Sequence, residues 1–254
     1  MLCLIGIGLR DANDITLKGL EHIKKADVIY LEGYTSLMQC SVDDLSTVYG
    51  KKVTPLGRPE IESSFILDEA EKKKVALLII GDPFAATTHS SLVMEARDRG
   101  IFVEIVHNAS ILSAVGETGL SLYKFGRVIS LLFGALPESV YDALCANQKC
   151  GLHTLCLLDI KVDENRFMTV NEGIRALLAL EEKCKKNLLS SVMLALGIAR
   201  LGGNGQVIKA GTFTELEKVD FGPPPHCIII PASERHFIEE GWISHWRKYT
   251  SGSN

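Results

Sequence analysis

An acidic residue that could bind a ligand follows the most apolar stretch of the chain. Six consecutive apolar residues, 75–80, are typical of a strand buried on both faces of a parallel sheet. Gly81-Asp82-Pro83 interrupts this run, because proline cannot continue a central strand. Asp82 is therefore predicted just beyond the carboxyl end of a strand, where open α/β sheets bind ligands. A carboxylate there could hold hydroxyl groups or a cation, although a plain turn before a helix explains the same residues about equally well.

Three further loops of the first half place small or charged residues in the same kind of position. They contain Leu9-Arg10-Asp11, Glu32-Gly33-Tyr34 and Asn108-Ala109-Ser110-Ile111. In a parallel sheet such loops lie along one edge. Together with the loop of Asp82 they could bind a ligand with a charged amine, a ribose and a flat base. The first half therefore predicts a small-molecule site.

Histidines, cysteines and glycines do not match the motifs of other common sites. No His-x-x-x-His or Cys-x-x-Cys spacing occurs, so no metal is expected. His89 is predicted to cap a helix or to pack in the core, and His226 is first interpreted as the start of a strand. Gly6 and Gly8 lack the third glycine of a dinucleotide-binding fingerprint. Seven scattered cysteines are typical of reduced thiols and predict a cytoplasmic protein.

Apolar runs alternate with amphipathic stretches through the first half, and this alternation predicts a parallel sheet with helical crossovers. Strands are expected at 2–7, 28–31, 75–80 and 101–106. Helices are expected after an N-cap at Asp14, from a capping box at Ser41-Val42-Asp43-Asp44 to Tyr49, over 61–74, and ahead of Gly100.

The second half has shorter links between its apolar runs. Strands are predicted at 128–133, 154–160, 192–198, 206–210 and 227–230, with helices from Glu138 and over 171–183. Residues 202–205, Gly-Gly-Asn-Gly, strongly indicate a hairpin, so this sheet should be mixed or antiparallel. The change of pattern places a domain boundary near residues 110–118, which gives domains 1–112 and 113–254.

Composition excludes several classes of protein. The chain has 254 residues, of which 46% are hydrophobic, and a net charge of −4. No basic block occurs, which argues against a nucleic-acid groove. No apolar run reaches the roughly 18 residues that a membrane span needs, and no signal peptide is expected because the chain opens with strand-like residues.

Longer motifs, spread from residue 1 to about residue 230, resemble the diphthine synthases, methyltransferases of the tetrapyrrole methylase fold group. These motifs are LIGIGLRDANDITLKGLE, GDPFAATTH, HNASI, LYKFG, HTLCLLDIKV and MTVNEG. The LYKFG and LLDIKV motifs are more similar to those of eukaryotic members than to those of archaeal members. The segment 162–168, however, is short, whereas many eukaryotic relatives carry a longer insertion at this place.

The resemblance implies a two-domain tetrapyrrole methylase-like α/β fold, with an N-terminal parallel sheet domain and a C-terminal mixed sheet domain. S-adenosylmethionine would bind in the cleft between them and leave as S-adenosylhomocysteine. Carried over by motif, the implied cofactor-binding residues are Leu9, Asp82, Ala85, Ser110, Ile111, Leu158, Leu201 and His226. The family varies at the positions of Ala85 and Leu201, so backbone contacts are expected there. His226 thus changes from an expected scaffold residue to an expected site residue.

The resemblance also implies the reaction and the partners. The substrate would be the amino group of a modified histidine on translation elongation factor 2, and the enzyme would be a homodimer. Methyl transfer from a sulfonium is an in-line displacement, so the protein mainly positions the reactants and excludes water. No catalytic residue is assigned, because a strong enzymatic base is not required. A tetrapyrrole methyltransferase and a non-catalytic adenosine-nucleotide binding protein are the alternatives.

Overall fold

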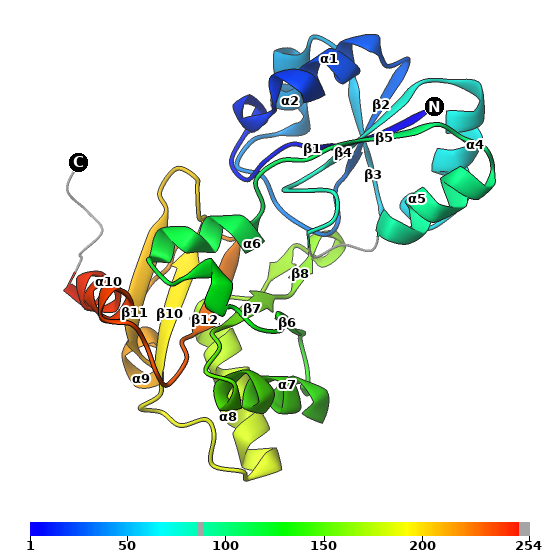
Figure 1. Ribbon diagram of the computed structural model, residues 1–254. Helices are drawn as coiled ribbons and strands as arrows, with labels where there is room; N and C mark the ends of the chain where they lie inside the picture. Colours follow the sequence, from blue (N-terminus) through cyan, green and yellow to red (C-terminus); the bar gives the residue numbers. More distant parts are fainter. Residues whose placement is uncertain (86–88, 249–254) are drawn as a thin grey trace. The chain divides into compact units, whose positions relative to one another are not determined.

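The computed structural model describes residues 1–85 and 89–248, which form two compact units. The first unit contains residues 1–114 together with two short segments, 161–164 and 202–204. The second unit contains 115–160, 165–201 and the chain from residue 205 onward. Each unit is built around its own five-stranded sheet (Figure 1).

The sheet of the first unit is entirely parallel, as the alternation of strands and helices predicts. Its strands lie in the order β3-β2-β4-β1-β5. Their bounds are β1 Leu2–Gly6, β2 Val28–Glu32, β3 Val53–Leu56, β4 Val75–Ile79 and β5 Val103–Val106. Every residue of β1 and β4 is buried, because these strands lie inside the sheet and are covered on both faces.

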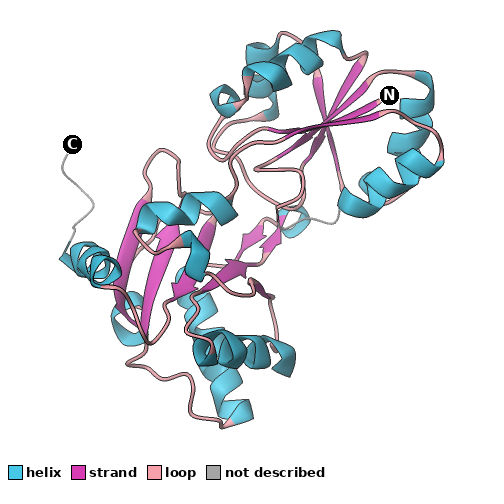
Figure 2. Ribbon diagram, in the orientation of Figure 1, coloured by secondary structure: helices cyan, strands magenta, loops and turns pink. Residues whose placement is uncertain are grey.

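Helices cover both faces of this sheet (Figures 1 and 2). Their bounds are α1 Leu17–Lys25, α2 Val42–Tyr49, α3 Arg58–Ile61, α4 Phe65–Lys72 and α5 His89–Asp98; the unit also contains the short helix α6 Ile111–Ala114. On one face, Ile23 of α1 and Leu45 of α2 pack in one apolar cluster. On the other face, Leu67 of α4 and Leu92 of α5 pack in a second cluster. The first unit is thus a three-layer α/β/α structure.

The sheet of the second unit is mixed, which confirms the predicted sheet type. Its order is β11-β10-β12-β7-β6, with only the β6–β7 pair parallel. The bounds are β6 Ile129–Leu131, β7 Thr154–Leu158, β10 Leu194–Ala199, β11 Val207–Thr212 and β12 His226–Ile230. A separate two-stranded ribbon joins β8 Ile160–Lys161 and β9 Arg166–Phe167. The turn at 202–205 connects the antiparallel strands β10 and β11, so the predicted hairpin is confirmed.

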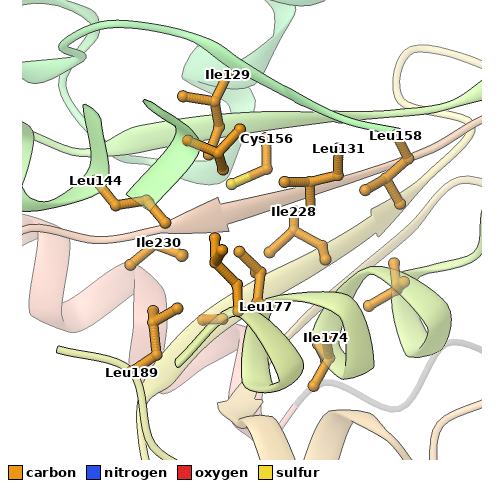
Figure 3. Packing of buried hydrophobic residues seen from close by; sticks show 14 of the residues in the cluster. Ile129, Leu131, Leu144, Cys156, Leu158, Ile174, Leu177, Leu189, Ile228 and Ile230 are labelled. Carbon is orange, nitrogen blue, oxygen red and sulfur yellow. The ribbon is translucent and has the colours of Figure 1, made fainter. Parts of the chain in front are cut away.

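The core of the second unit is formed by its sheet and the first three of its α-helices. The helices are α7 Glu138–Lys149, α8 Val170–Cys184, α9 Phe213–Leu216 and α10 Phe237–Lys248. Figure 3 shows side chains of β6, β7, β12 and α8 gathered in one cluster, among them Leu131, Leu177 and Ile228. Among the described residues, no helix has the length and apolarity that would let it traverse a lipid bilayer.

Several predicted helix boundaries are confirmed and two are wrong. The capping box of Ser41 and Asp44 begins α2, and Gly100 has the left-handed φ of +71° expected after a helix end. The N-cap of α1, however, is Thr16 rather than Asp14. The helix predicted over 61–74 is shorter than expected: α4 covers Phe65–Lys72, and Ile61 instead ends the separate short helix α3. Between the two helices the Ser63 hydroxyl donates to the Glu60 carbonyl and accepts from the Phe65 backbone N–H.

Several elements have no counterpart in the sequence-based prediction, and strand β3 and helix α10 show why. Strand β3 contains Pro55, which is tolerated because β3 lies at the edge of the sheet and one side of its backbone needs no partner. Helix α10 has Glu239 buried on one side and Phe237 exposed on the other, so its pattern does not show a simple apolar face.

Candidate cofactor site

At the carboxyl edge of the first sheet, glycines allow two loops to approach each other closely. Gly8 and Gly81 form an antiparallel bridge between the loops after β1 and β4, and both have left-handed φ angles near +80°. The backbone N–H of Gly81 donates to the Gly8 carbonyl over 2.7 Å. A Cβ atom on Gly6 would lie 2.6 Å from the Gly81 carbonyl oxygen. Glycine is therefore required where these two loops approach each other.

Asn108 and Asp14 hold the same edge together through side-chain hydrogen bonds to the backbone. The Asn108 amide donates to the carbonyls of Gly6 and Asp14, at 3.0 Å each. The Asp14 carboxylate accepts from the backbone N–H of Leu9 at 3.1 Å and of Arg10 at 2.7 Å. Asp14 thus shapes the loop after β1 instead of capping α1. The sequence shows a polar residue at each position but not the backbone carbonyls and N–H groups that lie within reach.

Asp82 joins the loops after β4 and β5. One carboxylate oxygen accepts from the Phe84 backbone N–H at 2.9 Å. The other accepts from the Asn108 backbone N–H at 3.1 Å and lies 2.8 Å from His107 Nδ1. Burial favours a higher pKa for Asp82, but the hydrogen bonds from Phe84, His107 and Asn108 outweigh it and lower the pKa below its usual value. Asp82 is therefore a charged residue that fixes loop geometry.

The five implied residues of the first unit lie in the loops that follow three neighbouring strands, β4, β1 and β5. Leu9 and Ala85 are partly exposed, and Ile111 begins α6. Ser110 is only 7% exposed, and its Cβ lies 3.6 Å from where a Cβ on Gly81 would be. Residues 86–88, including Thr87 and Thr88 of the GDPFAATTH motif, lie outside the described residues.

The three implied residues of the second unit lie at one end of its sheet. Leu158 ends β7, His226 begins β12, and Leu201 follows β10 by two residues. The register sets Ala199 of β10 opposite His226. Leu158 and Leu201 are 7% and 6% exposed, so their side chains belong mainly to the core.

His226 uses both ring nitrogens within the second unit. Nε2 lies 3.1 Å from the carbonyl oxygens of Gly222 and Pro223, while Nδ1 accepts from the Val170 backbone N–H at 3.4 Å. Because carbonyls only accept, Nε2 carries the proton and the ring is neutral. Burial lowers the pKa of His226, which preserves this neutral form. The ring nitrogens of His226 are thus occupied by the protein itself.

Sequence reasoning does not identify Arg200, which lies between the hairpin and the loop before β12. Its guanidinium donates to the backbone carbonyls of Gly205, Phe221 and Pro223. Its backbone has a left-handed φ of +50°, which is unusual for arginine. Arg200 therefore fixes the backbone beside Leu201 and His226. No sequence pattern shows this, because the partners are carbonyls.

Comparison with known proteins identifies the class of this α/β structure. Residues 1–217 match the family model of the tetrapyrrole (corrin/porphyrin) methylases. A solved structure from Entamoeba histolytica superposes with a TM-score of 0.91 at 40% identity, covering 98% of this chain and 99% of that one. The chain belongs to the tetrapyrrole methylase family and is a methyltransferase.

Full-length relatives define its place within the family. A diphthine methyl ester synthase of Dictyostelium discoideum is 42% identical and covers 97% of this chain and 98% of its own. A diphthine synthase of Methanocaldococcus jannaschii is 45% identical, with coverages of 94% and 96%. A crystal structure of a diphthine synthase gives a TM-score of 0.89 at 34% identity, over 97% of this chain and 95% of its own. Within the family the chain is one of the diphthine synthases, which methylate in diphthamide biosynthesis.

Proposed function

We propose that this protein transfers methyl groups from S-adenosylmethionine to the modified histidine of translation elongation factor 2. The observation that carries the proposal is full-length similarity to diphthine synthases and diphthine methyl ester synthases, with more than nine-tenths of each chain aligned. The substrate follows from the relatives' names together with the chemistry of their pathway.

The arrangement of the implied residues supports cofactor binding. In the first unit, these residues lie along the carboxyl edge of the parallel sheet, the usual ligand edge of this fold class. The glycine bridge and the carboxylate of Asp82 hold the loops of that edge together, and Ala85 and Ala109 are small residues of these loops. In the second unit, Leu158, Leu201 and His226 come to one sheet end. We propose that both groups bind S-adenosylmethionine, largely through the backbone.

The chemistry expected of the chain is positioning. S-adenosylmethionine supplies an activated methyl group, so the protein must hold a neutral amine in line with it and keep water out. We assign no residue as general base. No group of three or more His, Cys, Asp or Glu side chains within residues 1–85 and 89–248 is arranged to hold a metal ion.

Intact-mass analysis of elongation factor 2 tests the proposal. The factor carrying the aminocarboxypropyl-histidine intermediate is incubated with this protein and S-adenosylmethionine. We expect mass gains in steps of one methyl group, mapped to that histidine, and the number of steps distinguishes amine methylation from additional esterification. No gain together with methylation of a free tetrapyrrole would support a tetrapyrrole methyltransferase. Cofactor binding without transfer to either substrate would support a non-catalytic nucleotide-binding protein.

A further inference from the structure

A glutamate is completely buried at the carboxyl edge of the first sheet. Glu32 ends β2 and has no exposed surface. Within the described part of the chain, neither of its carboxylate oxygens receives a hydrogen bond of normal geometry. Burial raises the pKa of Glu32, although Thr35 and His89 lie close enough to offset part of the increase. A buried carboxylate of this kind is costly and needs a compensating partner.

Besides Thr35, the ionisable partner of Glu32 is His89, the first residue of α5. Its Nε2 lies 3.4 Å from Glu32 Oε2, and the histidine is only 4% exposed. The predicted packing of His89 in the core is therefore confirmed, but its surroundings are polar. Its other nitrogen, Nδ1, lies 3.2 Å from the carbonyl oxygen of Pro83.

The chemistry of these three groups fixes the protons on the ring. The Pro83 carbonyl can only accept, so Nδ1 must carry a hydrogen. One more proton is shared between Nε2 and the Glu32 carboxyl, either as imidazolium with carboxylate or as imidazole with carboxylic acid. Both arrangements are neutral overall and both keep the hydrogen bond from Nδ1 to Pro83.

This contact holds the Gly81–Ala85 loop at a point that Asp82 does not reach. Asp82 ties the loop to the backbone of Phe84 and Asn108. His89 instead holds the carbonyl of Pro83 and is itself held by Glu32 at the end of β2. The two sets of contacts share no atom. Pro83 lies between Asp82 and Ala85, two of the implied cofactor-binding residues.

We propose that Glu32 and His89 are positioning residues, which hold the Pro83 carbonyl so that the Asp82–Ala85 loop has the geometry that binds the cofactor. This inference rests on the proposed function. It assigns a purpose to a buried polar pair that the apolar packing of the first unit does not require. The active nitrogen is Nδ1 of His89, and Glu32 sets the orientation and protonation of the ring.

Paired substitutions in the full-length protein test which nitrogen matters. Glu32→Gln provides a neutral background in which the amide can donate to Nε2. In that background, His89→Asn places a donor near the position of Nδ1, whereas His89→Gln places one near Nε2. We expect the Glu32→Gln variant and its His89→Asn derivative to bind S-adenosylmethionine within about threefold of the wild type. The His89→Gln derivative should bind about tenfold more weakly, measured by calorimetry.

Control measurements separate positioning from loss of folding. His22→Gln alters another histidine–glutamate pair of the same unit, with Glu104 at 3.2 Å, and should leave cofactor affinity unchanged. Thermal unfolding of every variant identifies those that are folded. Equal affinities of folded Asn and Gln derivatives would overturn the inference. If the wild type itself did not bind S-adenosylmethionine, the proposed function would fail instead.

Nitrogen-15 NMR of the wild-type imidazoles gives a second test that does not depend on the folding of variants. We expect the His89 signal to report a protonated Nδ1 and to shift when S-adenosylmethionine is added, while the His22 signal stays constant. An unprotonated Nδ1 in His89 would overturn the inference whatever the affinities of the variants.

Discussion

Two carboxylates of this protein, Asp82 in a loop and Glu239 in α10, each accept several hydrogen bonds from the surrounding chain. Asp82 receives two backbone N–H groups and lies beside His107, and Glu239 receives a still larger set. Hydrogen bonds to a charged acceptor are worth roughly 1.5–3 kcal/mol. Substitution of either residue should therefore have a measurable effect, on ligand binding at Asp82 and on folding at Glu239.

Asp82→Ala should weaken S-adenosylmethionine binding by about tenfold or more while the protein stays folded, because the loops after β4 and β5 lose their shared acceptor. Isothermal calorimetry measures the affinity. Asp68→Ala on α4 is the matched control, because this exposed aspartate pairs with Arg99 away from the sheet edge. Unchanged affinity in Asp82→Ala would remove Asp82 from the cofactor site.

Glu239 should make the stability of the second unit depend on pH. It is 3% exposed and accepts from Lys124, Ser121, His153 and the His236 backbone N–H. Burial raises its pKa, but these bonds dominate and lower the pKa from 4.5 to about 2. A lowered folded-state pKa means that the charged form stabilises the fold above pH 4.5, and that this contribution is lost as the pH falls toward 2.

Glu239→Gln should therefore reduce the free energy of unfolding by about 2 kcal/mol at pH 7 and by less at pH 3. Urea unfolding at both pH values measures the difference from the wild type. Glu240→Gln is the control, because the neighbouring carboxylate is half-exposed and pairs with Arg235 at the surface. A loss for Glu239→Gln that is the same at both pH values would contradict the assignment.

At the scale of elements, two glycines show how position decides the effect of one methyl group. Gly197 lies within β10, where an added Cβ would be 2.3 Å from the Phe221 ring, itself buried in the core. Gly241 lies on the exposed side of α10, and an added Cβ would meet no atom within 4 Å. Core side chains thus fill the space beside Gly197 in β10, whereas the space beside Gly241 in α10 is open.

Alanine at these two positions should change stability in opposite directions. Gly197→Ala should lower the free energy of unfolding by about 1–3 kcal/mol through overpacking. Gly241→Ala should raise it by about 0.5–1 kcal/mol, because alanine loses less backbone entropy in a helix. Thermal and urea unfolding of both variants provide the comparison. Changes of the same sign would show that the packing around one of the two residues is different.

For the whole molecule, we propose a homodimer in the cytoplasm, as the family resemblance implies. The first unit exposes Phe102 and Met94, which are 67% and 64% accessible, and the second exposes Phe237 and Trp242. Large exposed apolar side chains of this kind are common where a second chain binds.

Light scattering at micromolar concentration should give about twice the 27.8 kDa mass of one chain. The mass should stay constant on moderate dilution if the interface is extensive. A value of 27.8 kDa at every concentration would contradict the homodimer.

Much of the molecule follows from local sequence patterns. The apolar runs at 2–7 and 75–80 become the buried strands β1 and β4, because a strand that is covered on both faces is apolar at nearly every position. The capping box at Ser41 and the glycine turn at 202–205 also act as predicted, since each depends on neighbouring residues alone. The loops that carry the predicted site therefore come to the edges where they are expected.

The tertiary structure alone decided the order of the strands and the partners of the polar residues. Pro55 belongs to a strand only because β3 lies at the edge of its sheet. Asp14 could cap a helix, but its carboxylate accepts from the N–H groups of Leu9 and Arg10, and Thr16 caps α1 instead. Glu32 and His89 are 57 positions apart in the sequence and face each other only in the folded chain. Apolar burial and turn formation depend on residues that are adjacent in the sequence. A buried polar group instead depends on partners that are distant in the sequence and become neighbours only in the folded chain.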